Sequence, residues 1–151
     1  MDNDDVIATL NKLIETCKDG EYGFRTCAEH ARSEQLRTVF LERAASCREG
    51  ATELQAEVAR LGGHPEADSS APGVLHRGWV NLKAALTGHD DLAALNECER
   101  GEDAALERYR EAIKKDLPSD VAAIVERQYA GVKRNHDQIR SLRDARRSTT
   151  A

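Results

Sequence analysis

The sequence predicts an all-α protein, an antiparallel four-helix bundle in which one long crossover joins the second and third long helices. Apolar residues recur every three or four positions over four long segments, as on the buried face of a helix. No segment shows the two-residue alternation of a β-strand. Pro65 and Pro72 lie between the periodic segments, and Pro118 lies at the very start of the last one. We expect residues 1–151 to form a single domain, because a chain of this length has room for one hydrophobic core.

The first two periodic segments predict a helical hairpin. Residues 4–31 keep their apolar stripe in phase across Gly20 and Gly23, so one continuous helix is expected there. A second helix is expected over residues 33–61, where a pair of glycines followed by Pro65 ends it. The connection between the two helices is short, which makes them antiparallel neighbours.

The second half of the chain predicts another hairpin and the crossover that leads to it. Helices are expected at about 90–115 and 118–143, and the few residues between them require an antiparallel pair. The connection 62–89 must then run the length of the bundle. It carries a short predicted helix at about 73–87, with Trp79 as the anchor that attaches it to the bundle.

Charge and cysteine usage exclude several classes of protein. The formal net charge is −5, with acidic and basic residues interleaved along the chain. The sequence has no basic stripe with aromatic residues, so we expect no nucleic-acid binding. No apolar run is long enough for a membrane span, and the acidic start of the chain does not resemble a signal peptide. The four cysteines form no closely spaced pair, which indicates reduced thiols in a cytoplasmic protein.

Polar residues interrupt the apolar stripes at one level of the predicted bundle. Glu99 and Glu102 occupy inward positions of the third helix, Glu21 lies on the inward face of the first, and His136 flanks the inward face of the fourth. All four lie about 14 to 17 residues from the same end of the bundle, within about one helical turn of one another. Burying carboxylates costs several kcal/mol unless they are paired, hydrated, protonated or bound to a metal.

Two explanations for this polar layer remain open at the level of the sequence. In the first, hydrated or arginine-paired carboxylates fix the register of the helices. In the second, Glu21, Glu99, Glu102 and His136 are candidate metal ligands, and oxygen donors with one imidazole suit iron, manganese or zinc. No cofactor is otherwise indicated.

Four stretches resemble a known family: residues 13–24, 75–79 and 97–103, and His136-Asp137. Over essentially the whole chain the sequence is similar to an uncharacterised bacterial family of ferritin-like four-helix bundles, the domain of unknown function DUF2383. The resemblance implies the ferritin-like fold but no established reaction. The wider superfamily holds two metals through one Glu on each of two helices and a Glu-x-x-His on each of the other two.

The resemblance carries over to single residues only in part. Glu21 matches the first-helix Glu of the superfamily, Glu99 or Glu102 the third-helix Glu, and His136 the fourth-helix His. Lys133 stands where the Glu of the last motif is expected, and the second helix has no Glu-x-x-His.

We therefore predict a non-catalytic ferritin-like bundle with a buried carboxylate layer that is able to bind a metal, the alternative being a di-metal oxidase or peroxidase or a metal-storage protein. No motif identifies a small-molecule substrate. Base rates favour a homo-oligomer, and we expect no nucleic-acid or membrane partner.

Overall fold

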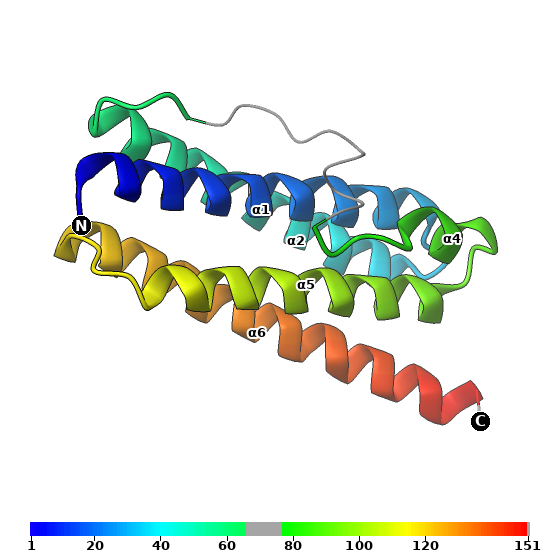
Figure 1. Ribbon diagram of the computed structural model, residues 1–151. Coiled ribbons are helices and arrows are strands. Elements are labelled where there is room, and N and C mark those ends of the chain that lie inside the picture. The colour runs from blue at the N-terminus through cyan, green and yellow to red at the C-terminus, as the bar shows by residue number, and fades with distance from the viewer. Residues whose placement is uncertain (66–76, 151) are drawn as a thin grey trace.

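The structure, a computed structural model, describes residues 1–65 and 77–150, and the regular structure in this part of the chain is entirely helical (Figure 1). The helices are α1 (Asn3–His30), α2 (Glu34–Arg60), α4 (Leu82–Thr87), α5 (Asp91–Ile113) and α6 (Ser119–Thr150). The α1–α2 and α5–α6 pairs are antiparallel hairpins, which confirms the predicted bundle with a crossover (Figure 1). None of the described helices is both long and apolar enough to cross a membrane.

Side-chain caps start three of the long helices where the sequence places short polar residues. Asp2 accepts from the Asp5 amide at 2.9 Å, Ser33 accepts from the Leu36 amide at 3.2 Å, and Asp90 accepts from the Leu92 amide at 2.9 Å. Each cap satisfies an amide that has no partner within its helix and stabilises it by about 1 kcal/mol.

The short helix of the crossover is shorter than predicted. Of the expected span 73–87, residues 73–76 lie outside the described part of the chain, and residues 77–81 are turns or irregular, so α4 begins at Leu82. Gly78 explains the difference, because its φ of +110° is incompatible with a right-handed helix.

The last helix is longer than predicted. We expected its end at about residue 143, but α6 continues to Thr150. No glycine or proline ends the helix near residue 143. Polar contacts also hold its final turns to α5: Arg146 Nη2 lies 3.8 Å from Asp91 Oδ2, and Arg147 Nη2 donates to Asn96 Oδ1 at 3.3 Å.

The apolar core of the bundle is divided into two clusters. One lies toward the α4 end and contains Phe24, Phe40, Trp79, Leu86, Leu95 and Ile139. The other lies toward the N-terminal end and contains Leu10, Leu13, Leu54, Val58, Tyr109, Val121 and Val125. Between them the middle of the bundle is lined by polar side chains, and Glu102 is the member of the predicted polar layer that lies among them.

Trp79 fixes the crossover in a slot between α1 and α5. Its indole is 2% exposed and meets Phe24 edge to face, with ring centroids 5.2 Å apart. A Cβ at Gly23 would lie 2.6 Å from the indole, and one at Gly101 would lie closer still. These two helical glycines therefore provide the space that the indole occupies. Next to it, Arg77 forms an ion pair with the buried Asp19, and its Nη2 donates to Oδ1 at 2.7 Å.

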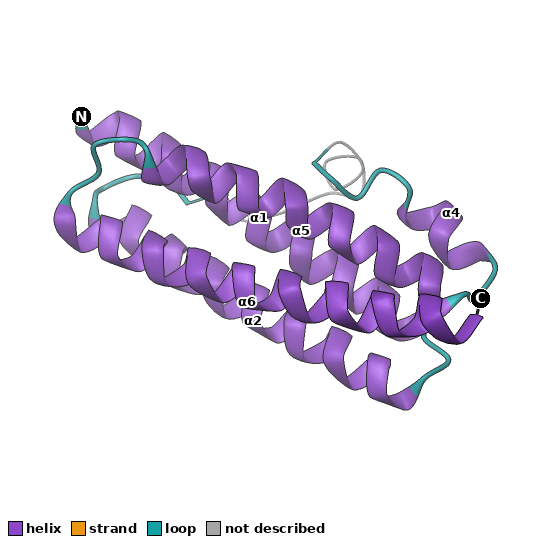
Figure 2. Cartoon of the chain, turned by 90° about the horizontal axis from the view of Figure 1, so that it is seen from below, coloured by secondary structure: helices purple, strands orange, loops and turns teal. Residues whose placement is uncertain are grey.

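The four long helices do not pack equally tightly. The α1–α2 and α5–α6 pairs are in contact along much of their length, and α1 also packs on α5. By contrast, α2 and α6 approach each other at only a few residues. Figure 2 shows the bundle from the side on which α6 is drawn across α2. The side of the bundle between α2 and α6 is therefore its open side.

The slot for Trp79 leads to a first prediction. We expect Gly101→Ala to lower the free energy of unfolding by about 1–3 kcal/mol, because the added methyl group overlaps the buried indole. Urea unfolding followed by circular dichroism measures the change. Gly131→Ala on α6 is the control: its Cβ meets nothing closer than 3.6 Å, so helix propensity should make it neutral or stabilising by up to about 1 kcal/mol. Equal effects of the two substitutions would contradict the inference that Gly101 provides space for the indole of Trp79.

Candidate functional site

Three glutamates of α5 face three different surroundings. The side chain of Glu97 faces the crossover and is 1% exposed, that of Glu99 faces α6 and is 13% exposed, and Glu102 lines the middle of the bundle with 5% of its surface exposed. The sequence predicted Glu99 and Glu102 as the inward pair. Glu97 is more buried than either, because the crossover covers a second side of α5.

Glu97 serves to attach the crossover. It accepts from Arg100 at 3.0 Å. Burial raises the pKa of Glu97, whereas the backbone amide of Asn81 and Arg100 oppose that rise. Asn81 immediately precedes α4, so this carboxylate ties the start of α4 to α5.

Glu102 is a buried carboxyl whose Oε1 has no hydrogen-bond partner. Burial raises the pKa of Glu102 from 4.5 to about 8, an effect that the Arg43 guanidinium opposes and that Asp103 and Asp137 reinforce. Near neutral pH this carboxyl therefore carries a proton for a substantial part of the time.

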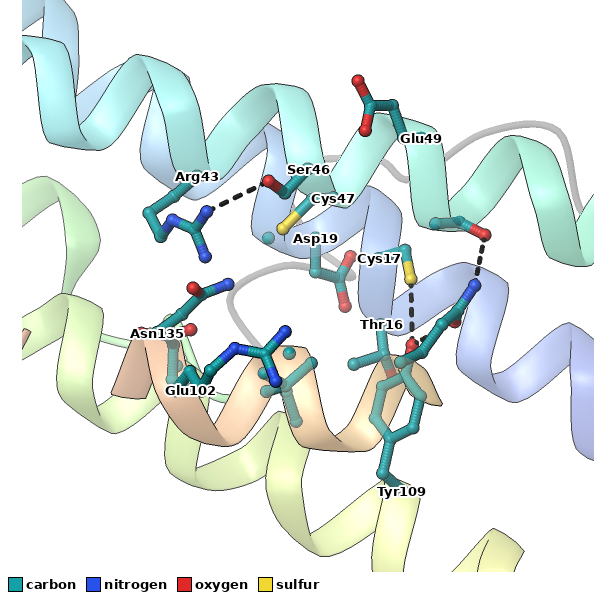
Figure 3. A pocket seen from close by; sticks show the side chains of 18 of the residues that line it. Thr16, Cys17, Asp19, Arg43, Ser46, Cys47, Glu49, Glu102, Tyr109 and Asn135 are labelled. Carbon is teal, nitrogen blue, oxygen red and sulfur yellow. Dashed lines mark hydrogen bonds between the residues drawn. The ribbon is translucent and has the colours of Figure 1, made fainter. Parts of the chain in front are cut away.

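A cavity of about 580 Å³ separates the two apolar clusters (Figure 3). All four long helices contribute to its wall, together with the crossover at Arg77 and Trp79. Half of the charged groups in its wall are paired with one another, Asp19 with Arg77 and Glu53 with Arg127. Of the others, Glu49 and Arg134 are exposed to solvent, whereas Glu102 and Arg43 each have a buried atom without a hydrogen-bond partner, which in Arg43 is Nη1.

Thiols and a tyrosine line the N-terminal side of this cavity. The Tyr109 hydroxyl donates to Gln128 at 2.8 Å and contacts Cys17 Sγ at 3.3 Å, and Gln128 donates to Glu53 at 2.7 Å. Burial raises the pKa of Cys17 to about 11 and the pKa of Cys47 well above its usual 9.0. Both thiols are therefore protonated and poor nucleophiles at neutral pH.

A second group of polar side chains lies between α5 and α6. Glu99, Asp103 and His136 each offer a ligand atom, and these three atoms lie within 4.8 Å of one another. His136 is 4% exposed, with Nε2 2.6 Å from Asp103 Oδ1 and Nδ1 3.3 Å from Asp137 Oδ1. Despite the short distance to Asp103, the buried Nε2 has no hydrogen bond, because the carboxylate oxygen lies outside hydrogen-bonding geometry.

Arginines hold Glu99 at the edge of this group. Arg143 Nη1 forms an ion pair with Glu99 Oε2, and Arg140 Nε lies 3.8 Å from Oε1. Glu99 is thus an arginine-paired carboxylate, one of the alternatives that the sequence left open. The same contacts fix its orientation toward α6.

The four candidate ligands of the sequence do not form one group. Glu99 and His136 lie together, Glu102 faces the cavity, and Glu21 lies in ion pairs within α1, 3.8 Å from Lys18 and 2.5 Å from Arg25. Sequence reasoning missed Asp103 as the third member of the α5–α6 group. Its signal was available, since residues four apart share a helix face and Asp103 follows Glu99 by one turn.

The two-metal arrangement of the ferritin-like superfamily does not fit these residues. Lys133 replaces the Glu of the last motif, and α2 presents Arg43 and Cys47 to the central cavity where the second Glu-x-x-His would lie. An arginine with an unpaired guanidinium nitrogen disfavours a cation at this position. Two of the carboxylates in the cavity wall, Asp19 and Glu53, are moreover engaged by Arg77 and Arg127.

Comparisons with known proteins agree with this fold. A family model described as Domain of unknown function (DUF2383) matches residues 5–115. No curated protein sequence matches the chain. Among solved structures, a dodecameric thioferritin, the bacterioferritin-related protein from Bacteroides fragilis, is similar at 19% identity and a TM-score of 0.79, with coverage of 99% of this chain and 91% of that chain.

Two further structures show the same ferritin-like likeness. A Dps1 mutant from Mycobacterium smegmatis has 14% identity and a TM-score of 0.77, with coverage of 93% of this chain and 96% of that chain. A two-domain protein from Anabaena variabilis, with DJ-1/ThiJ/PfpI-like and ferritin-like domains, has 17% identity and a TM-score of 0.79. That match covers 97% of this chain and 41% of the longer protein. The predicted ferritin-like bundle is thereby confirmed as the fold.

The raised pKa of Glu102 predicts a pH dependence of stability. Unfolded chains release this proton near pH 4.5 and the folded chain near pH 8, so the folded state binds more protons between these values. Its contribution to the free energy of unfolding is therefore complete below pH 4.5 and is lost as the pH rises through about 8. The loss is on the order of 5 kcal/mol.

We expect Glu102→Gln to remove this loss, so that the free energy of unfolding of the variant rises relative to that of the parent protein as the pH increases. Urea unfolding of the metal-free proteins between about pH 5 and pH 8.5 measures the difference. Glu42→Gln, on the exposed face of α2, is the control for removing one carboxylate. Parallel stability profiles for the parent and Glu102→Gln would show that the carboxyl is hydrated and ionised in the folded protein.

Proposed function

The chain belongs to the DUF2383 family, and we propose that it is a non-catalytic ferritin-like bundle that binds one divalent transition-metal ion through Glu99, Asp103 and His136. The observation that carries the proposal is the buried Nε2 of His136, which lacks a hydrogen bond although a carboxylate lies 2.6 Å away. A metal ion between the imidazole and the carboxylate would satisfy both.

His136 is oriented in the manner of a metal-binding histidine. Its Nδ1 lies 3.3 Å from the Asp137 carboxylate, which favours the tautomer with the proton on Nδ1. Nε2 then carries a lone pair, and its neighbours in this group are the carboxylates of Asp103 and Glu99. Carboxylate–histidine pairs of this kind fix ring orientation and raise the basicity of the ligand nitrogen.

The other two ligands suit an ion that keeps water molecules. Asp103 has 59% of its side-chain surface exposed, so solvent can complete the coordination sphere. One imidazole and two carboxylates are donors typical of iron, manganese or zinc. Arg143 remains paired with Glu99 and orients it, while its positive charge moderates the affinity for the cation.

A single ion at this site favours binding over redox catalysis. Oxidases and peroxidases of the di-metal carboxylate class need two ions held by about six protein ligands. The three ligands between α5 and α6 are too few for that purpose, and Glu21 and Glu102 lie in other surroundings.

The metal site is tested by titrating the full-length, EDTA-treated protein with Zn²⁺ and Mn²⁺ by calorimetry. We expect one ion per chain, and a loss of affinity of about tenfold or more in His136→Ala and Asp103→Asn, because each removes one of three ligands. Glu21→Gln is the matched control, since its carboxylate is paired within α1 and should not affect binding.

Two results would contradict the proposal. Unchanged affinity in His136→Ala would show that any bound ion lies elsewhere. Loss of affinity in Glu21→Gln would move the site to the centre of the bundle, as the superfamily arrangement implies. Circular dichroism of each variant establishes that the fold is retained.

The homo-oligomer expected from the sequence stays a proposal, supported by the dodecameric assembly of the similar protein from Bacteroides fragilis. Sedimentation velocity tests it. A discrete species well above the chain mass of 16.7 kDa is expected, and a sole species at that mass would contradict it.

A further inference from the structure

The central cavity contains two unsatisfied groups of opposite character. Arg43 Nη1 on α2 is a buried donor without an acceptor, and Glu102 Oε1 on α5 is a buried acceptor without a donor. The two side chains come from opposite corners of the bundle and line the same cavity, without forming an ion pair with each other (Figure 3). Arg43 Nη2 donates to Ser46 Oγ at 3.0 Å, but Nη1 and Glu102 Oε1 have no partner within the protein. Leaving these two atoms buried and unsatisfied is costly, so an occupant that pairs with both would complete the wall.

From this arrangement we infer that the cavity binds a small zwitterion of the amino-acid type, with its carboxylate on Arg43 and its ammonium group on Glu102. The carboxylate supplies the acceptor that Nη1 lacks. The ammonium group supplies the donor that Oε1 lacks, and Oε1 can accept it whether or not the carboxyl carries a proton.

The charges of the cavity distinguish this ligand from the alternatives. Asp19 is paired with Arg77 and Glu53 with Arg127, so neither pair competes for an incoming charge. A phosphate dianion would suit Arg43 but supply no hydrogen-bond donor to Oε1 of Glu102. A divalent cation would suit Glu102 but leave Arg43 facing a like charge. A zwitterion satisfies both ends and adds no net charge to a buried site.

The size of the cavity and its access also suit a small polar molecule. Its volume of about 580 Å³ is within the range of small-molecule sites. Ser46, Gly50 and Gly131 lie in its wall on the open side between α2 and α6, where the two helices meet at few residues. The sulfur atoms of Cys17 and Cys47 and the edge of Trp79 provide an uncharged surface for the side chain of the ligand.

The proposed zwitterion site is separate from the proposed metal site. None of Glu99, Asp103 and His136 lines the cavity. Binding of a zwitterion is therefore expected in EDTA-treated protein, and the two proposals can fail independently.

The test uses the full-length, EDTA-treated protein with L-alanine, L-serine and L-leucine as probes, followed by thermal unfolding and calorimetry up to about 10 mM. At least one of the three is expected to bind saturably and raise the melting temperature. Acetate lacks the ammonium group and ethylamine lacks the carboxylate. Each is expected to bind at least about tenfold more weakly than the amino acid.

Variants locate the ligand within the protein. Arg43→Met and Glu102→Leu each remove one polar end of the site at similar volume and should lower affinity by about tenfold or more. Arg48→Met, on the exposed face of α2, is the matched control and should bind normally. The ligand series needs no variant, so it tests the inference even if a substitution impairs folding.

Three outcomes would overturn the inference. If none of the three amino acids binds, the cavity holds only water. If acetate binds as tightly as the amino acid, the cavity is an anion site that uses Arg43 alone. If affinity survives both Arg43→Met and Glu102→Leu, the ligand binds elsewhere on the protein.

Discussion

The insertion of Trp79 between α1 and α5 determines which sides of α5 are buried. The indole fills a slot that only glycine at positions 23 and 101 leaves open, and it holds the crossover against one side of the bundle. This additional layer buries a second side of α5. A helix in an ordinary bundle presents one stripe to the core, whereas α5 has a buried face toward the crossover and another toward the cavity, with a third side packed on α6.

The three sides of α5 explain why three nearby glutamates have such different chemistry. Glu97 is paired with Arg100 and lies against the Asn81 amide, and Glu99 is paired with Arg143, so each has a cationic partner on the protein, although Oε2 of Glu97 is also buried without a hydrogen bond. Glu102 differs from both, because its Oε1 is buried without a hydrogen bond and no arginine or lysine among the described residues forms an ion pair with it. Paired carboxylates contribute to the fold, while an unpaired one indicates a ligand that the chain alone does not supply. The same criterion singles out His136 among the histidines described.

Most of the fold could be predicted because its signals are local. Caps at Ser33 and Asp90 and the positive φ of Gly62 follow from residue types that favour those conformations. The burial of Glu97 could not be predicted, because a single helical wheel assumes one buried face. The role of Arg43 could not be predicted either. On a helical wheel it is a flanking residue, whereas in the structure its side chain lines the cavity and its Nη1 is buried.

The division of the core into two apolar clusters allows the middle layer to remain open. Large side chains such as Phe24, Phe40 and Leu95 at one end, and Leu13, Leu54 and Val125 at the other, hold the helices together on both sides of the cavity. The layer between them can then retain Arg43 and Glu102, although apolar residues there would stabilise the fold more. Their retention is not explained by stability or by helix register, because unpaired groups supply neither. It is explained if the cavity is built to be occupied, since a ligand restores in the bound state the interactions that the free protein lacks.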